Sequence, residues 1–254
     1  MRKLILVSND DGYMAKGVRE LMKMLAPYGD VIAVCPHTGR SGQSMALTFD
    51  APLRVEEVES PVEGARLYSC NGTPVDCVKV SRQTVLNGRV PDLVVAGINH
   101  GSNASVNVVY SGTMGAVQEG CMWGAPAIGF SLTSHDPDAD FSALKPTVDA
   151  LVPKILEEGL PYGVFINVNA PDGVADAPMM FCRESRAHWS EEYEEYTDPM
   201  GRKFFMLAGH LVNDEPESTD TDLYALAHGR TAVVAEYLQR TASPTIVPDW
   251  LKNI

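Results

Sequence analysis

The chain has 254 residues, with 20 Lys or Arg, 33 Asp or Glu, and a net charge of −13 at pH 7. A hydrophobic fraction of 45% excludes a disordered or fibrous chain, and we expect a single domain over 1–254. The acidic balance argues against broad binding to DNA or RNA, because a surface that follows phosphates needs excess Lys and Arg. A small phosphorylated ligand is still compatible, because one metal ion or helix N-terminus reverses the local field.

The cysteines and the apolar runs bear on the cellular compartment. Five cysteines form an odd set without a CxxC pair, which is typical of reduced core residues. The apolar run at 4–7 is too short for a secretory signal, and no run approaches the ~18 residues of a membrane span. These features predict a soluble, cytoplasmic protein with neither a membrane nor a nucleic acid as partner.

The first half of the chain alternates apolar strands with helical patterns. A run of Leu, Ile and Val at 3–8 is typical of a strand covered on both faces, and apolar residues at helical spacing follow from Val18 to Leu25. The residues at 30–36 predict a second strand. Short alternating pieces at 45–70 predict exposed β structure.

Two capped helices and several further strands follow. Thr73 and Pro74 suit the N-cap and first position of a helix. We expect strands at 92–98, 127–132 and 163–168, a helix that begins near Ser111, and a helix over 144–156. The pattern predicts an α/β body at about 1–178 and 212–240. Aromatic residues in an alternating segment predict a C-terminal β-hairpin arm at about 179–211, followed by a tail at 241–254.

Several familiar motifs are absent from the sequence. No GxGxxG follows the first strand and there is no Walker A motif, which argues against nicotinamide and P-loop chemistry. No GxSxG or HExxH occurs, so a nucleophile elbow and a zincin helix are also unsupported.

Polar residues instead follow three predicted strands: Asp10 and Asp11, then Ser41, then Asn99. The carboxyl ends of parallel strands share one crevice, so these residues are expected to converge. Adjacent carboxylates repel each other unless a cation or water screens them, and hard oxygen donors favour Mg²⁺ or Mn²⁺. The alternative is that the aspartates form a turn and helix cap, with Ser41 and Asn99 as ordinary loop residues.

A second group, Ser111, Gly112 and Thr113, consists of small residues that open a helix. Free backbone N–H groups at such a helix start suit an anionic phosphate, and Asn103 is able to donate an amide N–H to the same group. The alternative is that Ser111 is a plain N-cap.

These segments resemble the SurE family of metal-dependent 5′/3′-nucleotidases. The resemblance is carried by 5–12, 40–42, 71–78, 97–103 and 110–113, in the family's order, with looser matches at 167–171 and 221–225. After Gly229 the chain departs from the strand that the family usually has.

The resemblance implies a Rossmann-like α/β fold with a mostly parallel sheet flanked by helices, and one divalent metal ion, Mg²⁺ or Mn²⁺, per subunit. It implies hydrolysis of nucleoside 5′- and 3′-monophosphates, with short polyphosphates as possible further substrates, and a homodimer or homotetramer formed through the arm. The implied metal ligands are Asp10, Asp11, Ser41 and Asn99, of which Asp10, Asp11 and Asn99 are also catalytic, and the implied phosphate pocket is Asn9, Asn103, Ser111, Gly112 and Thr113.

The working hypothesis is attack on phosphorus by a water molecule that the metal activates. Two alternatives stay open. Asp10 acting as a covalent nucleophile is one, although the pair lacks the Asp-x-Asp spacing of aspartyl-phosphate enzymes. The other is a nucleotide-binding regulatory protein with little turnover.

Overall fold

The computed structural model describes residues 2–243, 245 and 247–248, so most of the predicted tail at 241–254 lies outside the described residues. The strands of the central sheet are β1 (Leu4–Ser8), β2 (Asp30–Pro36), β3 (Val55–Val58), β4 (Arg66–Cys70), β5 (Leu93–His100), β6 (Ala127–Leu132), β7 (Val164–Ala170), β8 (Met179–Cys182) and β13 (Thr231–Tyr237). The helices are α1 (Lys16–Leu25), α2 (Pro74–Thr84), α3 (Asn107–Tyr110), α4 (Gly112–Met122), α5 (Lys145–Glu158) and α6 (Asp222–Ala227), with a 3₁₀ turn, η1 (Phe141–Leu144).

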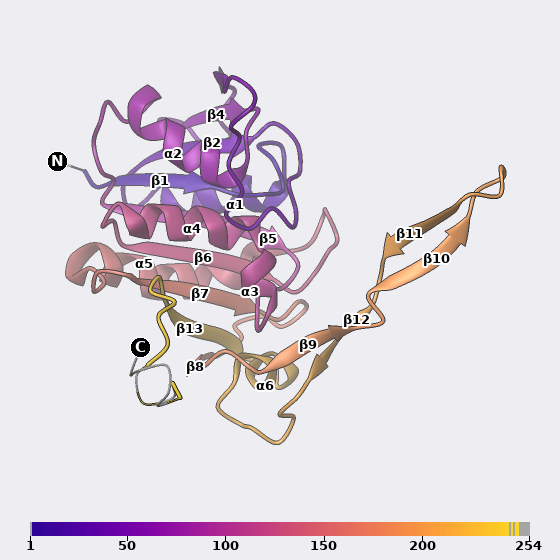
Figure 1. Ribbon diagram of the computed structural model, residues 1–254. Helices are drawn as coiled ribbons and strands as arrows, with labels where there is room; N and C mark the ends of the chain where they lie inside the picture. Colours follow the sequence, from indigo (N-terminus) through magenta and orange to yellow (C-terminus); the bar gives the residue numbers. More distant parts are fainter. Residues whose placement is uncertain (1, 244, 246, 249–254) are drawn as a thin grey trace.

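The central sheet has the strand order β3-β4-β2-β1-β5-β6-β7-β13-β8 (Figure 1). The six strands from β4 to β7 in this order run parallel, whereas β3 and β13 are antiparallel to their neighbours β4 and β7. The predicted α/β class with a mostly parallel sheet is therefore confirmed.

The alternation of β1 explains why its sequence is apolar throughout. Ile5 and Val7 pack in a core with residues of α1 and α5, whereas Leu4 and Leu6 pack in a second core with residues of α2 and α4. Because helices cover both faces of the sheet, a central strand needs apolar side chains at every position.

The helix starts also follow from the sequence. The Thr73 hydroxyl accepts a hydrogen bond from the backbone N–H of Asp76 at 3.1 Å, and the Asp76 carboxylate accepts one from the N–H of Thr73 at 2.9 Å. This reciprocal capping box confirms the predicted start of α2. At the start of α4, the Ser111 hydroxyl accepts from the N–H of Met114 at 3.0 Å.

Two local predictions differ from the structure, and one short helix was not predicted. The exposed β structure predicted at 45–70 holds for β3, but β4 is a mostly buried strand of the central sheet, because both cores cover it. The short helix α3 was not predicted. The strand β8 pairs with β13 in the central sheet, although the sequence placed it at the start of the arm.

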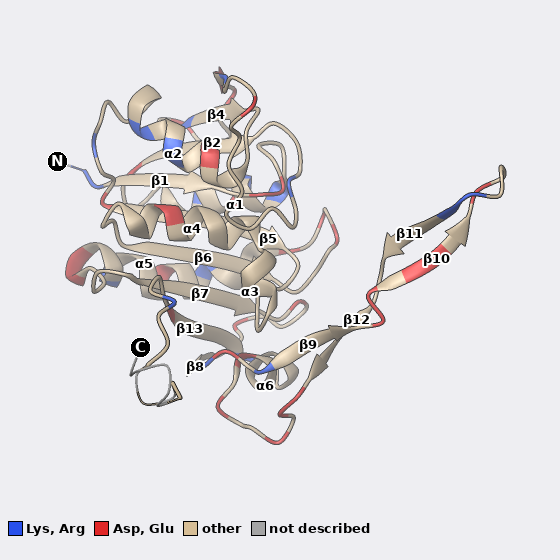
Figure 2. Ribbon diagram, viewed as in Figure 1, with Lys and Arg blue, Asp and Glu red and all other residues tan. Residues whose placement is uncertain are grey.

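Beyond the body lie two hairpins, β9 (Ala187–Ser190) with β12 (His210–Asn213) and β10 (Tyr193–Thr197) with β11 (Lys203–Leu207). They extend away from the sheet in Figure 1. Charged segments mark the outer hairpin in Figure 2. Lys203 of β11 forms an ion pair with Glu195 of β10 at 2.7 Å. Within the part of the chain that the structure covers, no helix has the length and apolar character needed to cross a membrane.

Candidate metal and phosphate site

The first part of the site forms where β1, β5 and the start of α4 meet at the carboxyl edge of the sheet. The Thr113 hydroxyl donates to Asp10 Oδ1 at 2.6 Å and lies 3.5 Å from Asn99 Oδ1. A hydroxyl has a single proton, so the shorter contact to Asp10 is the stronger one. The Thr113 hydroxyl therefore lies between side chains from two other segments, Asp10 and Asn99.

Gly112 allows α4 to approach this carboxylate closely. A Cβ atom at Gly112 would lie 2.9 Å from Asp10 Cβ, 3.0 Å from Asp10 Oδ2 and 3.1 Å from Pro74 Cγ. Any larger residue would push the helix start away from Asp10. The positive end of the α4 dipole consequently lies beside the acidic loop, where it favours an anionic ligand.

Asp11 and the loop that carries Ser41 join the same edge. The backbone N–H of His100 donates to Asp11 Oδ2 at 3.1 Å, next to Asn99 in the chain. The N–H of Arg40 donates to the carbonyl oxygen of Asp10 at 2.6 Å. The structure therefore brings together Asp10, Asp11 and Asn99 and fixes the loop beside them, while the side chain of Ser41 is exposed on that loop.

The surroundings of the two aspartates disfavour their charged forms. Asp10 is 3% exposed, and burial, with repulsion from Asp11 as the second cause, raises its pKa to about 6. Burial also raises the pKa of Asp11 to about 6, against the opposing hydrogen bond from His100. Neighbouring carboxylates in this state gain most from a positive ion between them.

The residues at this edge fit a divalent cation. Within the described ranges, neither Asp10 nor Asp11 has a salt-bridge partner. The buried Asn9 Oδ1 also lacks a hydrogen-bond partner there. No group of three or more His, Cys, Asp or Glu able to hold a metal occurs among these same residues. A cation would therefore depend on two carboxylates together with amide and hydroxyl oxygens, a donor set that suits Mg²⁺ or Mn²⁺.

The predicted phosphate residues lie along the same edge, and several already make internal hydrogen bonds. Ser111 is the N-cap of α4, as the alternative interpretation had it, which leaves the neighbouring backbone N–H groups at the helix start. Asn103 donates through Nδ2 to Ser131 Oγ at 2.9 Å, and Asn9 donates through Nδ2 to the carbonyl oxygen of Gly12 at 2.9 Å.

A hollow of about 470 Å³ opens beside Asp11. Its lining residues are Asp11, Met14, Ala15, Lys16, His100, His135, Pro137 and Asp138. The volume lies within the roughly 300–1,000 Å³ that is usual for small-molecule sites. Sequence reasoning missed His135, because no spacing pattern connects it to the first loop. Only the fold brings it to Asp11.

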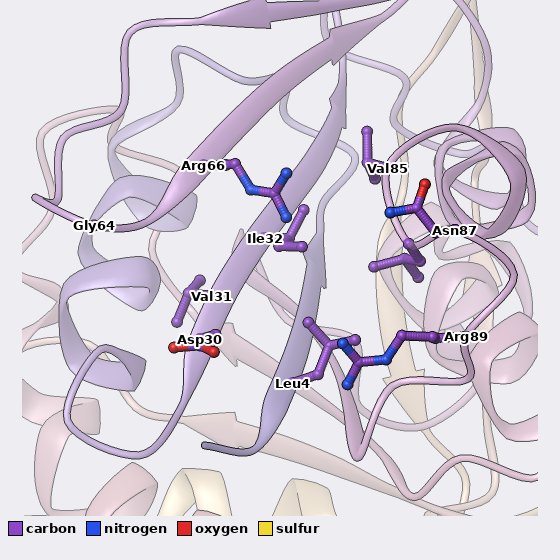
Figure 3. A pocket seen from close by; sticks show the side chains of 10 residues that line it. Leu4, Asp30, Val31, Ile32, Gly64, Arg66, Val85, Asn87 and Arg89 are labelled. Carbon is purple, nitrogen blue, oxygen red and sulfur yellow. The ribbon is translucent and has the colours of Figure 1, made fainter. Parts of the chain in front are cut away.

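Another hollow, of about 290 Å³, lies at the opposite edge of the sheet (Figure 3). Leu4, Asp30 and Arg66, at the amino ends of β1, β2 and β4, line it together with Arg89. Because ligands of open α/β sheets bind at the carboxyl ends of the strands, this hollow is separate from the candidate site.

Together, the fold and the site define a class: a doubly wound α/β protein with a buried carboxylate pair at the carboxyl edge of its sheet. Residues 5–191 match the family model described as Survival protein SurE. The chain is 44% identical over 241 residues to a protein named 5′-nucleotidase SurE from Bacteroides fragilis, covering 95% of this chain and 94% of the relative. A relative of the same name from Phocaeicola vulgatus is 45% identical over 241 residues, covering 95% and 93%.

The solved structure of the SurE protein from Aquifex aeolicus gives a similar result. It matches with a TM-score of 0.82 and 30% sequence identity, over 98% of both chains. The chain belongs to the SurE family, which confirms the resemblance found in its motifs.

Proposed function

We propose that the protein is a 5′-nucleotidase that hydrolyses nucleoside 5′- and 3′-monophosphates to nucleoside and phosphate, with one Mg²⁺ or Mn²⁺ ion per subunit. The relatives named 5′-nucleotidase SurE support the reaction. The observation that carries the metal dependence is the pair of neighbouring carboxylates, Asp10 and Asp11. Burial raises the pKa of each to about 6, and neither carboxylate has a salt-bridge partner in the described ranges.

In this proposal Asp10, Asp11, Ser41 and Asn99 would hold the ion, which when bound would supply Lewis acidity and a water of lowered pKa. The protein contributes orientation. The Thr113 hydroxyl fixes Asp10 Oδ1, and the N–H of His100 fixes Asp11 Oδ2, so each carboxylate keeps its other oxygen for a ligand or for a proton.

The start of α4 binds the phosphate group. Backbone N–H groups at Gly112 and Thr113 and the amides of Asn9 and Asn103 supply hydrogen-bond donors, with Ser111 capping the helix. Because these donors are held in place before the reaction, they stabilise negative charge that grows on the phosphoryl oxygens. The hollow beside Asp11 receives the nucleoside, between the side chains of Met14 and His135.

Several finer features belong to the same proposal. Short polyphosphates share the phosphate group that the α4 start binds, so they are further substrates. A homodimer or homotetramer forms through the hairpins, where Phe205 and Leu207 are 60% and 73% exposed. The protein acts in the cytoplasm, where its five buried thiols stay reduced.

The test is phosphate release from AMP and GMP by the full chain with Mn²⁺ or Mg²⁺, before and after EDTA treatment. We expect EDTA to abolish release and added Mn²⁺ to restore it. Release that persists after complete chelation would contradict the metal dependence. Calorimetry that showed AMP binding without phosphate release would favour a nucleotide-binding regulator, and a trapped phosphoenzyme would favour Asp10 as nucleophile.

A further inference from the structure

A row of buried polar side chains crosses the sheet next to the proposed metal site. In the strand register, Asn99 of β5 pairs with Ser131 of β6, and Ser131 pairs with Asn169 of β7. Ser131 and Asn169 are both 0% exposed. Polar side chains in buried strands are costly unless hydrogen bonds satisfy them, so this row needs a reason.

The reason lies in the loop that follows β5. Asn169 Oδ1 accepts hydrogen bonds from the N–H of Asn103 at 2.7 Å and from the Ser102 hydroxyl at 3.3 Å. Asn167 Nδ2 donates to the carbonyl oxygen of Asn103 at 2.9 Å. Both backbone polar groups of Asn103 are therefore held by side chains of β7.

The side chain of Asn103 is held by the next strand. Its Nδ2 donates one N–H to Ser131 Oγ at 2.9 Å. A carboxamide nitrogen carries two hydrogens, so the second N–H of Asn103 stays available for another acceptor.

The two β7 amides also bond to each other. Asn169 Nδ2 donates to Asn167 Oδ1 at 2.9 Å, which orients both β7 amides in turn. Buried networks of this kind favour one conformation over its alternatives, because any other loop position would leave polar groups unpaired. In the portion that the structure describes, the side chains of Ser131 and Asn169 make no hydrogen bond to the side chains of Asp10, Asp11 or Asn99.

We propose that Ser131 and Asn169 are positioning residues, which act through Asn103 by holding its backbone and its carboxamide so that one N–H meets the phosphate of the substrate. This inference rests on the proposed function, because it takes Asn103 as a phosphate contact. It adds two strand residues without a place in the metal site to the machinery of phosphate recognition.

The test is a double-mutant cycle with Ser131→Ala and Asn103→Ala in the full chain. The binding of inorganic phosphate to the Mn²⁺-loaded protein is measured by calorimetry, and KM and kcat are measured with AMP. We expect Ser131→Ala to weaken phosphate binding about 10-fold, as supporting residues of catalytic sites typically do. The double variant should bind phosphate no more weakly than Asn103→Ala alone, because Ser131 acts through Asn103.

Three comparisons separate positioning from a general loss of structure. Ser131→Thr keeps the hydroxyl and should restore most of the phosphate affinity. Ser81→Ala removes another fully buried serine hydroxyl, which donates to Val78 O at 2.6 Å within α2, and should leave phosphate binding unchanged. Binding of Mn²⁺ alone should be equal in wild type and Ser131→Ala. Asn169→Ala should weaken phosphate binding at least as much as Ser131→Ala.

Two results would overturn the proposal: unchanged phosphate affinity in a folded Ser131→Ala variant, or additive losses in the cycle. Failure of the proposed function gives a different result. Wild-type protein would then release no phosphate from AMP, while the calorimetric cycle would still decide whether Ser131 and Asn103 act as one unit. A wild-type protein that binds no phosphate at all would contradict both proposals.

Discussion

The carboxyl edge of the sheet and the outer hairpin differ from the usual burial pattern in opposite directions. At the edge, Asp10 is 3% exposed and Asn169 is 0% exposed, so charged and polar groups lie in the interior. On the hairpin, Phe205 and Leu207 are 60% and 73% exposed, so large apolar groups lie in solvent. Buried polar and exposed apolar groups are the informative exceptions to the general rule.

The two regions motivate two separate proposals about what binds from outside the chain. For the buried carboxylates we propose a cation, because burial raises the pKa of each to about 6 and repulsion from Asp11 adds to the rise at Asp10. For the exposed apolar residues we propose a covering surface on another subunit, because leaving them in water forgoes about 25 cal/mol per Å² of apolar area. The proposed cation concerns catalysis and the proposed covering surface concerns assembly. Variants in the two regions should therefore change either turnover or oligomeric state, but not both.

The largest expected effect is that of Asp11→Asn on turnover. Losing a metal ligand should lower phosphate release from AMP by about 10³-fold or more. The melting temperature of the metal-free protein should be maintained or rise, because the change removes a buried charge. As a control, Asp30→Asn affects an exposed carboxylate at the opposite edge, paired with Arg2 at 3.2 Å, and should keep full turnover. Lost stability with retained rate in Asp11→Asn would indicate a structural cap.

A smaller loss is expected from Thr113→Val. The valine keeps the shape but removes the hydroxyl that donates to Asp10 Oδ1 at 2.6 Å. We expect a decrease in kcat for AMP of about 10- to 100-fold, which is typical for a group that orients a metal ligand. Thr113→Ser retains the hydroxyl and should keep most of the activity. Equal losses in both variants would show that packing, and not the hydrogen bond, is what matters.

Removal of the outer hairpin should affect assembly and leave turnover largely intact. The N–H of Ala208 donates to the carbonyl oxygen of Glu192 at 2.8 Å, so these two residues already lie side by side. An Asn-Gly turn in place of 193–207 would therefore connect them without moving the strands. Light scattering should show dissociation of the proposed oligomer. Phosphate release per chain should change by less than the ~10-fold minimum expected for Thr113→Val. An unchanged oligomer would contradict assembly through the hairpin.

The smallest effect on turnover is expected at Glu236, which accepts from Asn167 Nδ2 at 2.8 Å. Burial is the largest cause that raises the pKa of Glu236 to about 7, with Glu184 and Asp222 adding repulsion. A raised folded-state pKa means that its ionisation destabilises the fold increasingly as pH rises from about 4.5 to 7.

Glu236→Gln keeps an oxygen for Asn167 and removes this charge. The variant should therefore raise the melting temperature at pH 8 by several degrees, on the order of 1–3 kcal/mol, and change it little at pH 5. Turnover should stay unchanged. The exposed Glu57→Gln is the matched control and should show no such difference between the two pH values. A gain that is equal at both pH values would contradict the ionisation argument.

The sequence predicted those features that depend on neighbouring residues. The apolar runs identified most central strands, and the Thr73 cap identified the start of α2, because each is a local pattern. The carboxyl ends of parallel strands lie at one edge of a sheet, and this rule alone predicted that the acidic loop and Asn99 would lie close together. The structure brings Asp10, Asp11 and Asn99 to one edge.

Features that depend on strand pairing were not predictable in this way. The place of β8 beside β13 is set by tertiary pairing and not by its own sequence. The roles of Ser131 and Asn169 depend on register across three strands, which a single sequence does not display. Two asparagines at alternate positions of a buried strand, Asn167 and Asn169, were the available signal, since buried amides need specific partners.

The most direct test of the account is Mn²⁺ binding measured beside turnover in the same samples. Titration of metal-free protein followed by electron paramagnetic resonance should show one tightly bound ion per chain, with phosphate release from AMP rising in proportion to the bound ion. Asp11→Asn should lose both the bound ion and the release. Full phosphate release from a chain that binds no divalent ion would contradict the claim that the buried carboxylate pair works by holding a metal.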